Sequence, residues 1–291
     1  MADNELSCPP ADPNPRTPKV KAPPGTCDTH AHVFEARYPY SPRRGYTPPD
    51  APYEAYRHLL DVLGATRAVL AQPSAYGTDN SAILDAVARD PSNMRAVAAV
   101  DAGVTDEQLR ALDAAGVRGI RVNLVDKGGM PFDSFDDVER FASRIAPMGW
   151  HIEYLVHVHD FPDLDALARM PVDAVVGHFG YMPTTCGVDH PGYRAFLRLV
   201  EGGRIWVKLT APYRITACGD LPYDDVEPLA RALREARPDR LLWGSDWPHA
   251  INKKPMANDG DLFDLIAAWL PEERLREQVL ADNPKHLYGF D

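Results

Sequence analysis

The sequence predicts a single-domain α/β fold, a (β/α)8 barrel of the TIM type. Eight short runs rich in apolar and β-branched residues recur along the 291-residue chain, and amphipathic or charged stretches separate them. Such alternation indicates a parallel sheet, and eight repeats favour closure of that sheet into a barrel. A barrel of this type takes ~250 residues, so we expect residues 25–291 to form it without a second domain.

The predicted strands and helices follow one another in strict order. The strands are expected at residues 26–33, 67–72, 96–100, 119–124, 151–156, 173–177, 205–209 and 241–244. Helical patterns between them cover residues 79–90, 106–115, 135–148, 224–236 and 262–270. An open, doubly wound sheet is the main alternative. No G-x-G-x-x-G motif follows the first strand, which argues against a dinucleotide-binding sheet.

Composition and charge narrow the possible partners. Residues 1–24 are rich in Pro, Asp and Lys and contain no apolar signal segment, so we expect a flexible N-terminal arm. No apolar run approaches the ~20 residues that span a bilayer, so no membrane partner is expected. The net charge of -11 argues against nucleic acid, whose phosphates need a cationic surface. A small anionic substrate is compatible with this charge if the fold builds a local cationic pocket.

Cysteine usage points to a reducing compartment. The 4 cysteines show no paired spacing, which argues against a disulfide framework or a structural zinc site. We therefore expect a cytoplasmic protein. The sequence does not indicate an oligomeric state.

The pair His30-x-His32 on the first predicted strand is the strongest local sign of chemistry. Residues i and i+2 of a strand point to one face, so both imidazoles should enter the barrel side by side. Buried imidazoles can bind a metal or polarise a carbonyl group. Two incidental histidines at a strand end are the alternative, which the preceding Asp28 and the eight-strand context make less attractive.

Asp246 and His178 follow the eighth and sixth predicted strands. The C-terminal ends of barrel strands form the active-site face, so both residues should meet the first-strand histidines at one mouth. The tryptophans on either side of Asp246 are expected to shield its carboxylate from water, which would raise its basicity and suit it to accept a proton. A helix cap is the alternative role for Asp246, and a rim position is the alternative for His178.

Cations and hydroxyls near the same mouth are candidates for binding an anion. Arg121 lies inside the fourth strand, where a buried guanidinium needs a carboxylate or an anionic ligand. Lys127 and Arg214 lie in loops, where a solvated surface charge is the simpler interpretation. The candidate substrate-binding residues are Arg121, Arg214, Lys127, Tyr46, Ser74 and Tyr76.

A second H-x-H pair, His157 and His159, ends the fifth predicted strand. We prefer a solvent-exposed position for this pair. His157 shares a strand face with Glu153, so either side chain could instead reach the site.

Taken together, five motifs resemble those of the 2-pyrone-4,6-dicarboxylate lactonase family within the amidohydrolase superfamily. They occur in order between Gly25 and Tyr288, nearly the whole chain. The motifs are Asp-Thr-His-Ala-His-Val-Phe at 28–34, Gly-Thr-Asp-Asn at 77–80, Gly-Ile-Arg-Val-Asn at 119–123, Gly-His at 177–178 and Trp-Gly-Ser-Asp-Trp-Pro-His at 243–249.

The resemblance implies a hydrolase in which water attacks a lactone carbonyl. It implies that Asp246 is the general base and that His30, His32 and His178 polarise the carbonyl. The reaction in that family is reversible and independent of metal. By position, the resemblance assigns the substrate carboxylates to Arg121, Arg214, Tyr46 and Ser74.

Three residues depart from the family pattern, and all belong to its substrate-binding part. Lys127 stands in place of an arginine, Leu155 in place of a tyrosine, and Tyr76 in place of a histidine. Loss of the arginine weakens bidentate binding of one carboxylate. The expected substrate is therefore 2-pyrone-4,6-dicarboxylate or a close analogue, with a muconolactone-type compound or a sugar-acid lactone as alternatives.

We favour no cofactor, although a single Zn²⁺ or Mn²⁺ would suit the donors. The potential ligands are His30, His32, His178 and Asp246. Residues 119–124 include no lysine for a carbamate bridge, so two metals are not expected. The competing functions are a metal-dependent decarboxylase of the same superfamily and, more remotely, a non-catalytic barrel that binds an aromatic acid.

Overall fold

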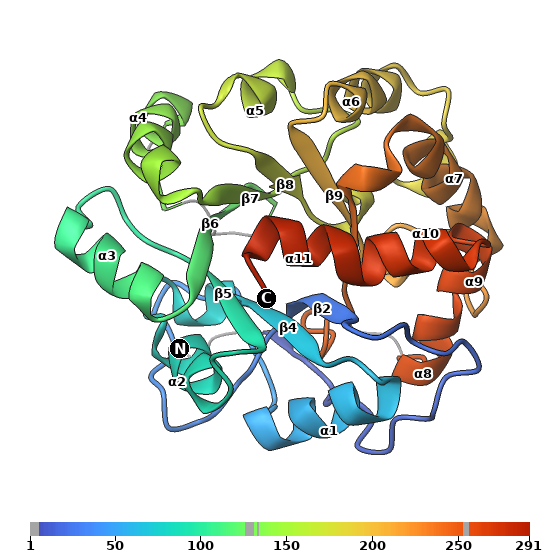
Figure 1. Ribbon diagram of the computed structural model, residues 1–291, viewed down its shortest axis with the longest axis horizontal. Helices are drawn as coiled ribbons and strands as arrows, with labels where there is room; N and C mark the ends of the chain where they lie inside the picture. Colours follow the sequence, from blue (N-terminus) through green and yellow to red (C-terminus); the bar gives the residue numbers. More distant parts are fainter. Residues whose placement is uncertain (1–5, 126–130, 133, 253–255) are drawn as a thin grey trace.

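The computed structural model describes residues 6–125, 131–132, 134–252 and 256–291. Eight parallel strands form one sheet in the order β10-β9-β8-β7-β6-β5-β4-β2, and helices surround it (Figure 1). The strands are β2 (Cys27–Ala31), β4 (Arg67–Ala71), β5 (Met94–Ala98), β6 (Val117–Asn123), β7 (His151–Leu155), β8 (Ala174–Val176), β9 (Ile205–Leu209) and β10 (Leu241–Trp243). The predicted barrel is confirmed.

The first and last strands come together at their C-terminal ends. Ala31 forms a parallel bridge with Trp247, and the His32 amide donates to the Trp247 carbonyl oxygen at 2.8 Å. The Asp246 amide donates to the His30 carbonyl oxygen at 2.8 Å. These backbone bonds nearly close the barrel, and they do so between segments that carry predicted site residues.

The helices form the outer layer of the barrel. They are α1 (Tyr53–Leu63), α2 (Ser81–Arg89), α3 (Asp106–Ala114), α4 (Phe135–Ile145), α5 (Asp165–Arg169), α6 (Pro191–Glu201), α7 (Glu227–Ala236), α8 (Asp259–Asp264), α9 (Ile266–Trp269), α10 (Glu273–Glu277) and α11 (Asn283–Tyr288). Short 3₁₀ turns are η1 (Ser74–Tyr76), η2 (Ala146–Met148), η3 (His178–Tyr181), η4 (Thr184–Cys186), η5 (Pro212–Arg214), η6 (Asp224–Val226) and η7 (Pro238–Arg240), and η8 (Gln278–Asp282) is a π turn.

Helix α1 illustrates why these segments are helical. Its buried residues Tyr56, Leu59, Leu60 and Leu63 recur at helical spacing and form one apolar face. The helix ends at Gly64, whose φ of 77° allows the left-handed turn that stops it. No helix in the described part of the chain combines the length and apolarity needed to cross a bilayer.

The C-terminal helices α10 and α11 cross the end of the barrel that faces the viewer in Figure 1. Tyr288 and Phe290 join a buried apolar cluster with residues from six strands, namely Cys27, Val69, Val97, Val175, Trp206 and Leu242. This end of the barrel interior is therefore apolar and filled, and the polar site lies towards the other end.

The N-terminal segment packs along the barrel. Strand β1 (Leu6–Ser7) pairs in parallel with β3 (Tyr46–Thr47), which lies in the loop after β2. The amide of Arg16 donates to Asn258 Oδ1 at 2.7 Å, and that of Val20 donates to Asp264 Oδ1 at 2.8 Å. The flexibility of residues 1–24 stays a prediction.

Candidate active site

Four predicted residues converge at the mouth of the barrel. His30 and His32 lie at the end of β2, His178 begins the turn after β8, and Asp246 follows β10. Asp246 Oδ1 lies 3.6 Å from His30 Nε2, 3.8 Å from His32 Nε2 and 3.8 Å from His178 Nε2. All four residues are buried. One carboxylate oxygen therefore faces three imidazoles.

The segment after β10 needs an unusual backbone to bring Asp246 there. A Cβ on Gly244 would lie 2.7 Å from His30 Cβ, so only glycine allows this close approach. Several non-glycine residues at this mouth have positive φ angles, namely His178 (51°), Ala211 (51°), Asp246 (61°) and His249 (62°). The mouth thus combines tight packing with backbone conformations that most residues avoid.

The two oxygens of Asp246 have different surroundings. Oδ2 accepts hydrogen bonds from the Tyr213 hydroxyl at 2.5 Å and from Arg214 Nε and Nη2 at 3.0 and 2.8 Å. Oδ1 is the oxygen that faces the histidines. Because Oδ2 is already occupied, Oδ1 is the oxygen available to take a proton or to bind a metal.

The electrostatic environment of Asp246 differs from the sequence-based expectation. Burial raises the pKa of Asp246, but the Arg214 guanidinium outweighs it and holds the pKa well below its usual range. The expected net increase in basicity from the flanking tryptophans is therefore wrong. Trp247 instead stacks on Tyr56, and Trp243 packs edge-on against Phe263.

Partners on the far side of each ring set the tautomers of the first-strand histidines. His32 Nδ1 lies 2.7 Å from the Ala71 carbonyl oxygen, so Nδ1 carries the proton and donates. His30 Nδ1 lies 3.0 Å from Glu153 Oε1, where a proton on Nδ1 faces a carboxylate. Burial is the largest cause that lowers the pKa of both histidines, so both are neutral at pH 7. Their Nε2 lone pairs then point at the mouth.

Glu153 and Lys208 form a buried ion pair behind His30. Lys208 Nζ lies 2.5 Å from Glu153 Oε2 and donates to the Thr29 carbonyl oxygen at 2.6 Å. Burial would raise the pKa of Glu153, but Lys208 and His30 outweigh it and hold the pKa well below its usual range. The ionised Glu153 fixes the His30 ring, which answers the open question of whether Glu153 reaches the site.

A second buried chain of polar groups supports Asp246 from the other side. The Tyr213 hydroxyl, which donates to Asp246, lies 3.1 Å from His249 Nδ1. His249 Nε2 lies 2.9 Å from Asp259 Oδ1 at the start of α8. This chain ties the carboxylate to a helix on the outside of the barrel and restricts its rotation.

The donor atoms also fit one divalent cation. Ligand atoms of His30, His178 and Asp246 lie within 4.8 Å of one another, and His32 Nε2 faces the same carboxylate oxygen. His30 Nε2 is buried and has no hydrogen-bond partner among the described residues. Metal-binding histidines characteristically donate their other ring N–H to a carboxylate or a carbonyl, as His30 and His32 do here.

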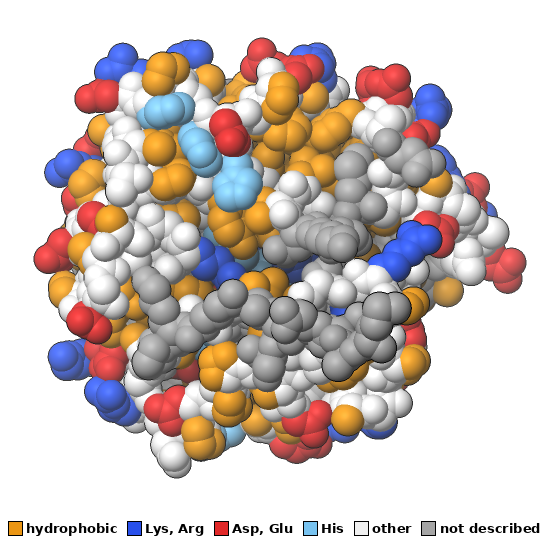
Figure 2. All heavy atoms as spheres, turned by 180° about the vertical axis from the view of Figure 1, so that it is seen from behind, with side chains coloured by type: hydrophobic (Ala, Val, Ile, Leu, Met, Phe, Trp, Pro, Cys, Tyr) orange, Lys and Arg blue, Asp and Glu red, His pale blue; other side chains and the backbone are white. Residues whose placement is uncertain are grey.

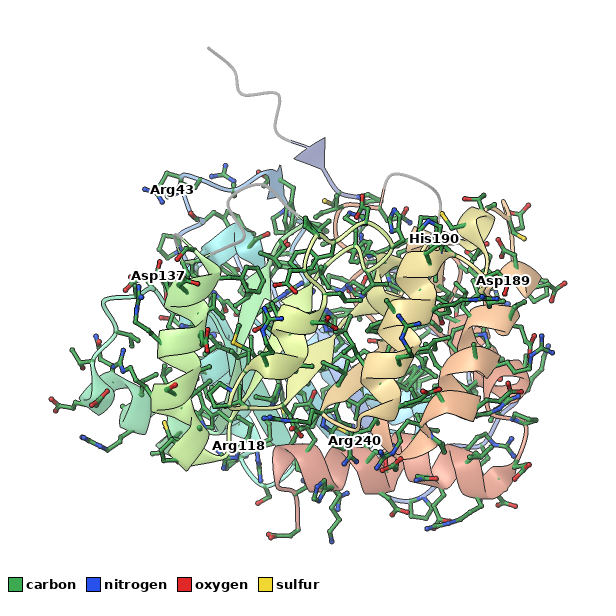
Figure 3. All side chains as sticks on the ribbon, turned by 90° about the horizontal axis from the view of Figure 1, so that it is seen from above. Arg43, Arg118, Asp137, Asp189, His190 and Arg240 are labelled. Carbon is green, nitrogen blue, oxygen red and sulfur yellow. The ribbon has the colours of Figure 1, made fainter. Side chains whose placement is uncertain are left out.

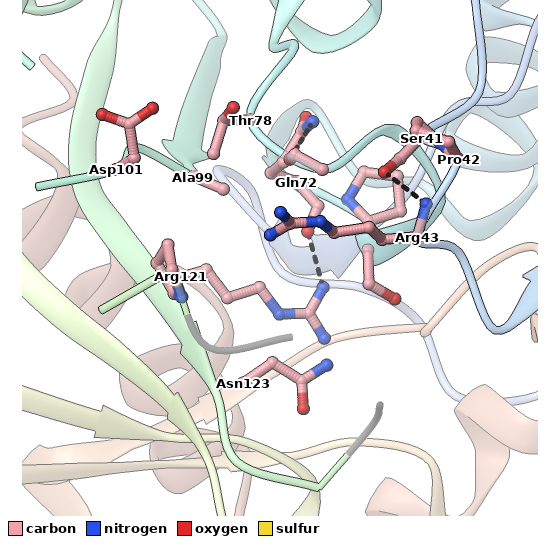
Figure 4. A pocket seen from close by; sticks show the side chains of 13 residues that line it. Ser41, Pro42, Arg43, Gln72, Thr78, Ala99, Asp101, Arg121 and Asn123 are labelled. Carbon is pink, nitrogen blue, oxygen red and sulfur yellow. Dashed lines mark hydrogen bonds between the residues drawn. The ribbon is translucent and has the colours of Figure 1, made fainter. Parts of the chain in front are cut away.

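A cavity of about 380 Å³ lies next to the support of His32: Gln72 lines it and follows Ala71, whose carbonyl oxygen holds His32, although no described histidine lines it. Arg121 and Ser74, two predicted substrate-binding residues, line it (Figure 4). Arg121 Nη1 donates to the Gln72 carbonyl oxygen at 2.9 Å. The preceding carbonyl in the chain, that of Ala71, is the one that holds His32. Figure 2 shows Lys/Arg and histidine side chains in the hollow of this face.

The other predicted substrate-binding residues have different positions. Arg214 binds Asp246 Oδ2, and Tyr46 is buried with its ring 6.5 Å from that of Phe34. The Tyr76 hydroxyl bonds the backbone of Glu35, and its ring stacks on Tyr40, so it supports the loop after β2. Lys127 lies outside the described residues.

The second H-x-H pair lies one ring away from the site. His157 is half-buried, and its ring centroid lies 5.2 Å from that of Tyr181, which in turn lies 5.1 Å from His178. His159 is half-buried beside it, so the pair is less exposed than expected.

Sequence reasoning missed several residues that hold the site together. Tyr213, Lys208 and Asp259 were not singled out, Glu153 was left with an open role, and His249 was noted only as part of the motif at 243–249. Glu153 and Lys208 each sit on a strand among apolar residues, which is the one signal that could have revealed them.

The fold and the site together define a (β/α)8-barrel hydrolase with a buried His/Asp centre. The family model described as Amidohydrolase matches residues 27–290. The chain therefore belongs to the amidohydrolase family, as the motifs indicated.

Two proteins and one solved structure are similar to this chain over nearly its whole length. The chain is 38% identical over 286 residues to a 2-pyrone-4,6-dicarboxylate hydrolase from Comamonas testosteroni, covering 94% of this chain and 93% of that protein. It is 38% identical over 278 residues to a 4-sulfomuconolactone hydrolase from Rhizobium radiobacter, covering 92% and 91%. The crystal structure of a probable 2-pyrone-4,6-dicarboxylic acid hydrolase from Acinetobacter baumannii, with citric acid bound, matches with a TM-score of 0.80 and 28% identity. It covers 91% of this chain and 100% of that one.

Proposed function

We propose that the protein hydrolyses a carboxylated lactone, with 2-pyrone-4,6-dicarboxylate or a close analogue as substrate. The observation that carries this proposal is the buried Asp246 carboxylate, which turns one free oxygen towards three imidazoles at the mouth of a barrel. The relatives named for lactone hydrolysis support the choice of bond. We also propose that the substrate is a small anion and that the protein is cytoplasmic. The proposal includes no nucleic acid or membrane partner.

In this proposal Asp246 Oδ1 takes a proton from water as the water oxygen attacks the lactone carbonyl carbon. The carbonyl oxygen lies among His30, His32 and His178 and needs an Nε2–H donor there as its negative charge develops. In the metal-free form His178 supplies it, because His178 Nδ1 has no hydrogen-bond partner among the described residues and the proton can reside on Nε2 of the neutral ring. The ring C–O bond then breaks, and Asp246 returns its proton to the leaving oxygen. Tyr213 and Arg214 hold Oδ2 throughout, so the same oxygen accepts and returns the proton.

In this proposal four side chains orient the anionic groups of the substrate, namely Arg121, Arg214, Ser74 and Tyr46. Arg121 and Ser74 line the cavity beside Gln72, and Arg214 lies against the proposed base. Tyr76 supports the loop that forms one wall, and Lys127 stays a prediction.

One divalent cation, if bound, would be held by His30, His32, His178 and Asp246 and would polarise the carbonyl or lower the pKa of a bound water. We keep catalysis without metal as the first form of the proposal, following the family resemblance. Elemental analysis of the purified protein, with activity measured before and after chelation, separates the two forms.

The test is the ultraviolet spectrum of 2-pyrone-4,6-dicarboxylate mixed with the protein, because opening the ring removes the pyrone absorption. We expect the wild type to open the ring and Asp246→Asn to lose roughly 100- to 10,000-fold in kcat. The variant should still bind the substrate, since the asparagine keeps the size of the side chain.

Three outcomes would contradict the proposal or a part of it. Failure of the wild type to open any carboxylated lactone, including muconolactone-type and sugar-acid lactones, would overturn it. Release of CO₂ that depends on a bound metal would instead establish the alternative, a decarboxylase. Normal turnover by Asp246→Asn would remove Asp246 from the proposed role of base.

A further inference from the structure

The cavity beside Gln72 contains a second arginine that the sequence motifs did not indicate. Arg43 comes from the loop between β2 and α1, whereas Arg121 comes from β6. Figure 4 shows both guanidinium groups reaching into the same space, with Asn123 and Gln72 on either side. Figure 3 places Arg43 at the mouth end of the barrel, opposite the end that carries Arg118 and Arg240.

Arg121 is a buried cation without an ion pair among the described residues, although its charge acts on Glu153 on the neighbouring strand. Its side chain is 8% exposed, and its Nη1 donates to a carbonyl oxygen rather than to a carboxylate. Its Nε is buried and has no hydrogen-bond partner among the described residues. Burying a charge in this way is costly unless an opposite charge arrives. The cavity is therefore built to receive an anion.

Arg43 is exposed, and within the described part of the chain its guanidinium has no ion pair or hydrogen bond. Its neighbours in the loop are engaged differently: Arg37 pairs with Glu35, and Arg44 donates to Thr47 and to the Ser41 carbonyl oxygen. Repulsion between two guanidinium groups in one cavity would separate them unless an anion lay between them.

The loop backbone holds Arg43 in place. The Arg43 amide donates to Ser41 Oγ at 3.2 Å, and the Ser41 amide donates to the Ala75 carbonyl oxygen at 2.8 Å. The Tyr76 hydroxyl bonds the same loop at Glu35. These bonds fasten the loop to the turn after β4, which carries Ser74, so Arg43 stays above the cavity.

The remaining wall is polar and largely neutral. Ser41, Ser74, Thr78 and the amide of Asn123 can donate hydrogen bonds to an anion's oxygens. Asp101 is the one acidic residue among the lining residues described. Its Oδ1 accepts from the Gly103 amide at 2.9 Å, and Figure 4 places it across the cavity from Arg43.

We propose that Arg43 and Arg121 together bind one of the two anionic groups of a dianionic lactone. Arg43 is then a specificity-determining residue that favours lactones carrying two anionic groups, carboxylate or sulfonate, over lactones carrying one. This inference rests on the proposed lactone hydrolysis for its substrate class. The evidence for the anion site itself is the cavity and its two guanidinium groups, neither of which forms an ion pair with a described residue.

The kinetic test compares 2-pyrone-4,6-dicarboxylate with its two monocarboxylates, 2-pyrone-4-carboxylate and 2-pyrone-6-carboxylate. We expect Arg43→Met to raise KM for the dicarboxylate by about tenfold or more, since it loses a charge-assisted contact, and to leave kcat within about twofold. KM for one of the two monocarboxylates, the one that lacks the group bound by Arg43, should stay unchanged. The matched control is Arg37→Gln, an exposed arginine of the same loop outside the cavity, which should leave all three substrates unaffected.

Equal changes for all three lactones, or no change for any of them, would overturn the role of Arg43 even if the enzyme is a lactonase. If the wild type opens none of these pyrones, the anion site is tested separately by calorimetric titration with citrate, and the proposed function fails only if no other carboxylated lactone is opened. Citrate binding that weakens about tenfold in Arg43→Met and not in Arg37→Gln supports the site. Wild-type protein that binds neither citrate nor the dicarboxylate contradicts it.

Discussion

Tyr213 determines which oxygen of Asp246 is free to react. Its hydroxyl, together with Arg214, occupies Oδ2 and leaves Oδ1 facing the three histidines. A hydrogen bond to a charged group contributes about 1.5–3 kcal/mol. Without this bond the carboxylate could rotate and offer either oxygen, so fewer encounters would have productive geometry.

We therefore expect Tyr213→Phe to lower kcat about tenfold or more, with a much smaller change in KM. Steady-state kinetics on the active lactone measures both constants. The matched control is Tyr193→Phe, which removes another buried hydroxyl, bonded to the Leu229 carbonyl oxygen far from the site. It should cost stability and leave kcat unchanged. A Tyr213→Phe enzyme with wild-type kcat would show that Arg214 alone orients the base.

At the scale of elements, Asp225 links two loops at the mouth. Its carboxylate accepts hydrogen bonds from Thr184 Oγ1 in the turn after β8, from Thr216 Oγ1 and from the Ala217 amide after β9. Partial burial raises its pKa, but these bonds outweigh it and lower the pKa to about 2. The folded state therefore stabilises the ionised carboxylate of Asp225.

A depressed folded-state pKa adds stability above the unfolded-state pKa, and this contribution is lost as the pH falls through the folded-state value. We expect Asp225→Asn to unfold at lower urea concentration than wild type at pH 6. The difference should shrink as the pH falls from about 4 to about 2. The control is Asp224→Asn, an exposed neighbour without a side-chain hydrogen bond in the described part of the chain. A gap that stays constant down to pH 2 would contradict this account.

The barrel strands could be predicted because their apolar runs are distinct from the charged stretches between them. The least accurate strand was β5, expected at 96–100 and found at Met94–Ala98. Arg95 explains the shift, since a charged residue in a buried strand looks like a loop in the sequence. In the fold, Arg95 bonds the carbonyl oxygens of Pro91 and Gly289, the latter from the far end of the chain. Helices α1 and α6 were not given residue ranges from the sequence, although both have buried faces at helical spacing.

The site could be predicted only in part, for a similar reason. The histidines and Asp246 stand in recognisable motifs at strand ends. The pairing of Glu153 with Lys208 joins β7 to β9 across the barrel interior, and their partnership depends on the register of strands that are not adjacent. Arg43 reaches the cavity through the fold of a long loop, which no periodic pattern reports.

At the scale of the whole molecule, the Glu153–Lys208 pair places opposite charges at the centre of the barrel. Both side chains are fully buried, with no exposed surface. Removing one partner of such a pair leaves the other charge uncompensated and costs roughly 3–5 kcal/mol. Replacing both partners with neutral groups removes most of that cost.

We expect Lys208→Met to lower the free energy of unfolding by roughly 3–5 kcal/mol, measured by urea denaturation. The double variant Lys208→Met/Glu153→Gln should regain much of this stability. Its kcat should stay low, because His30 has lost the carboxylate that faces its Nδ1. A double variant with full activity would show that the pair serves stability alone, and a stable Lys208→Met would show that Glu153 is not held as an anion.

The cavity is cationic although the chain as a whole has a net charge of -11. An approaching anion is repelled at long range, and that repulsion is screened over about 8–10 Å at physiological ionic strength. Inside the cavity, Arg43 and Arg121 place two positive charges against one acidic lining residue, Asp101. Selection among anions is thus made inside the cavity and not by long-range attraction.

The left-handed backbone at His178, Ala211, Asp246 and His249 bears on how this protein could be altered. Each such conformation costs a non-glycine residue on the order of 1 kcal/mol, and here the costs gather where the chemistry is proposed. A glycine would relieve this cost most simply at Ala211, where only a methyl group is lost. At His178 and Asp246 it would remove side chains proposed to act on the substrate, and at Asp246 it would also leave the Arg214 guanidinium without its buried partner. Stability and turnover therefore place opposite demands on the residues at the mouth of the barrel. Substitutions that raise stability without lowering turnover are expected in the outer helices.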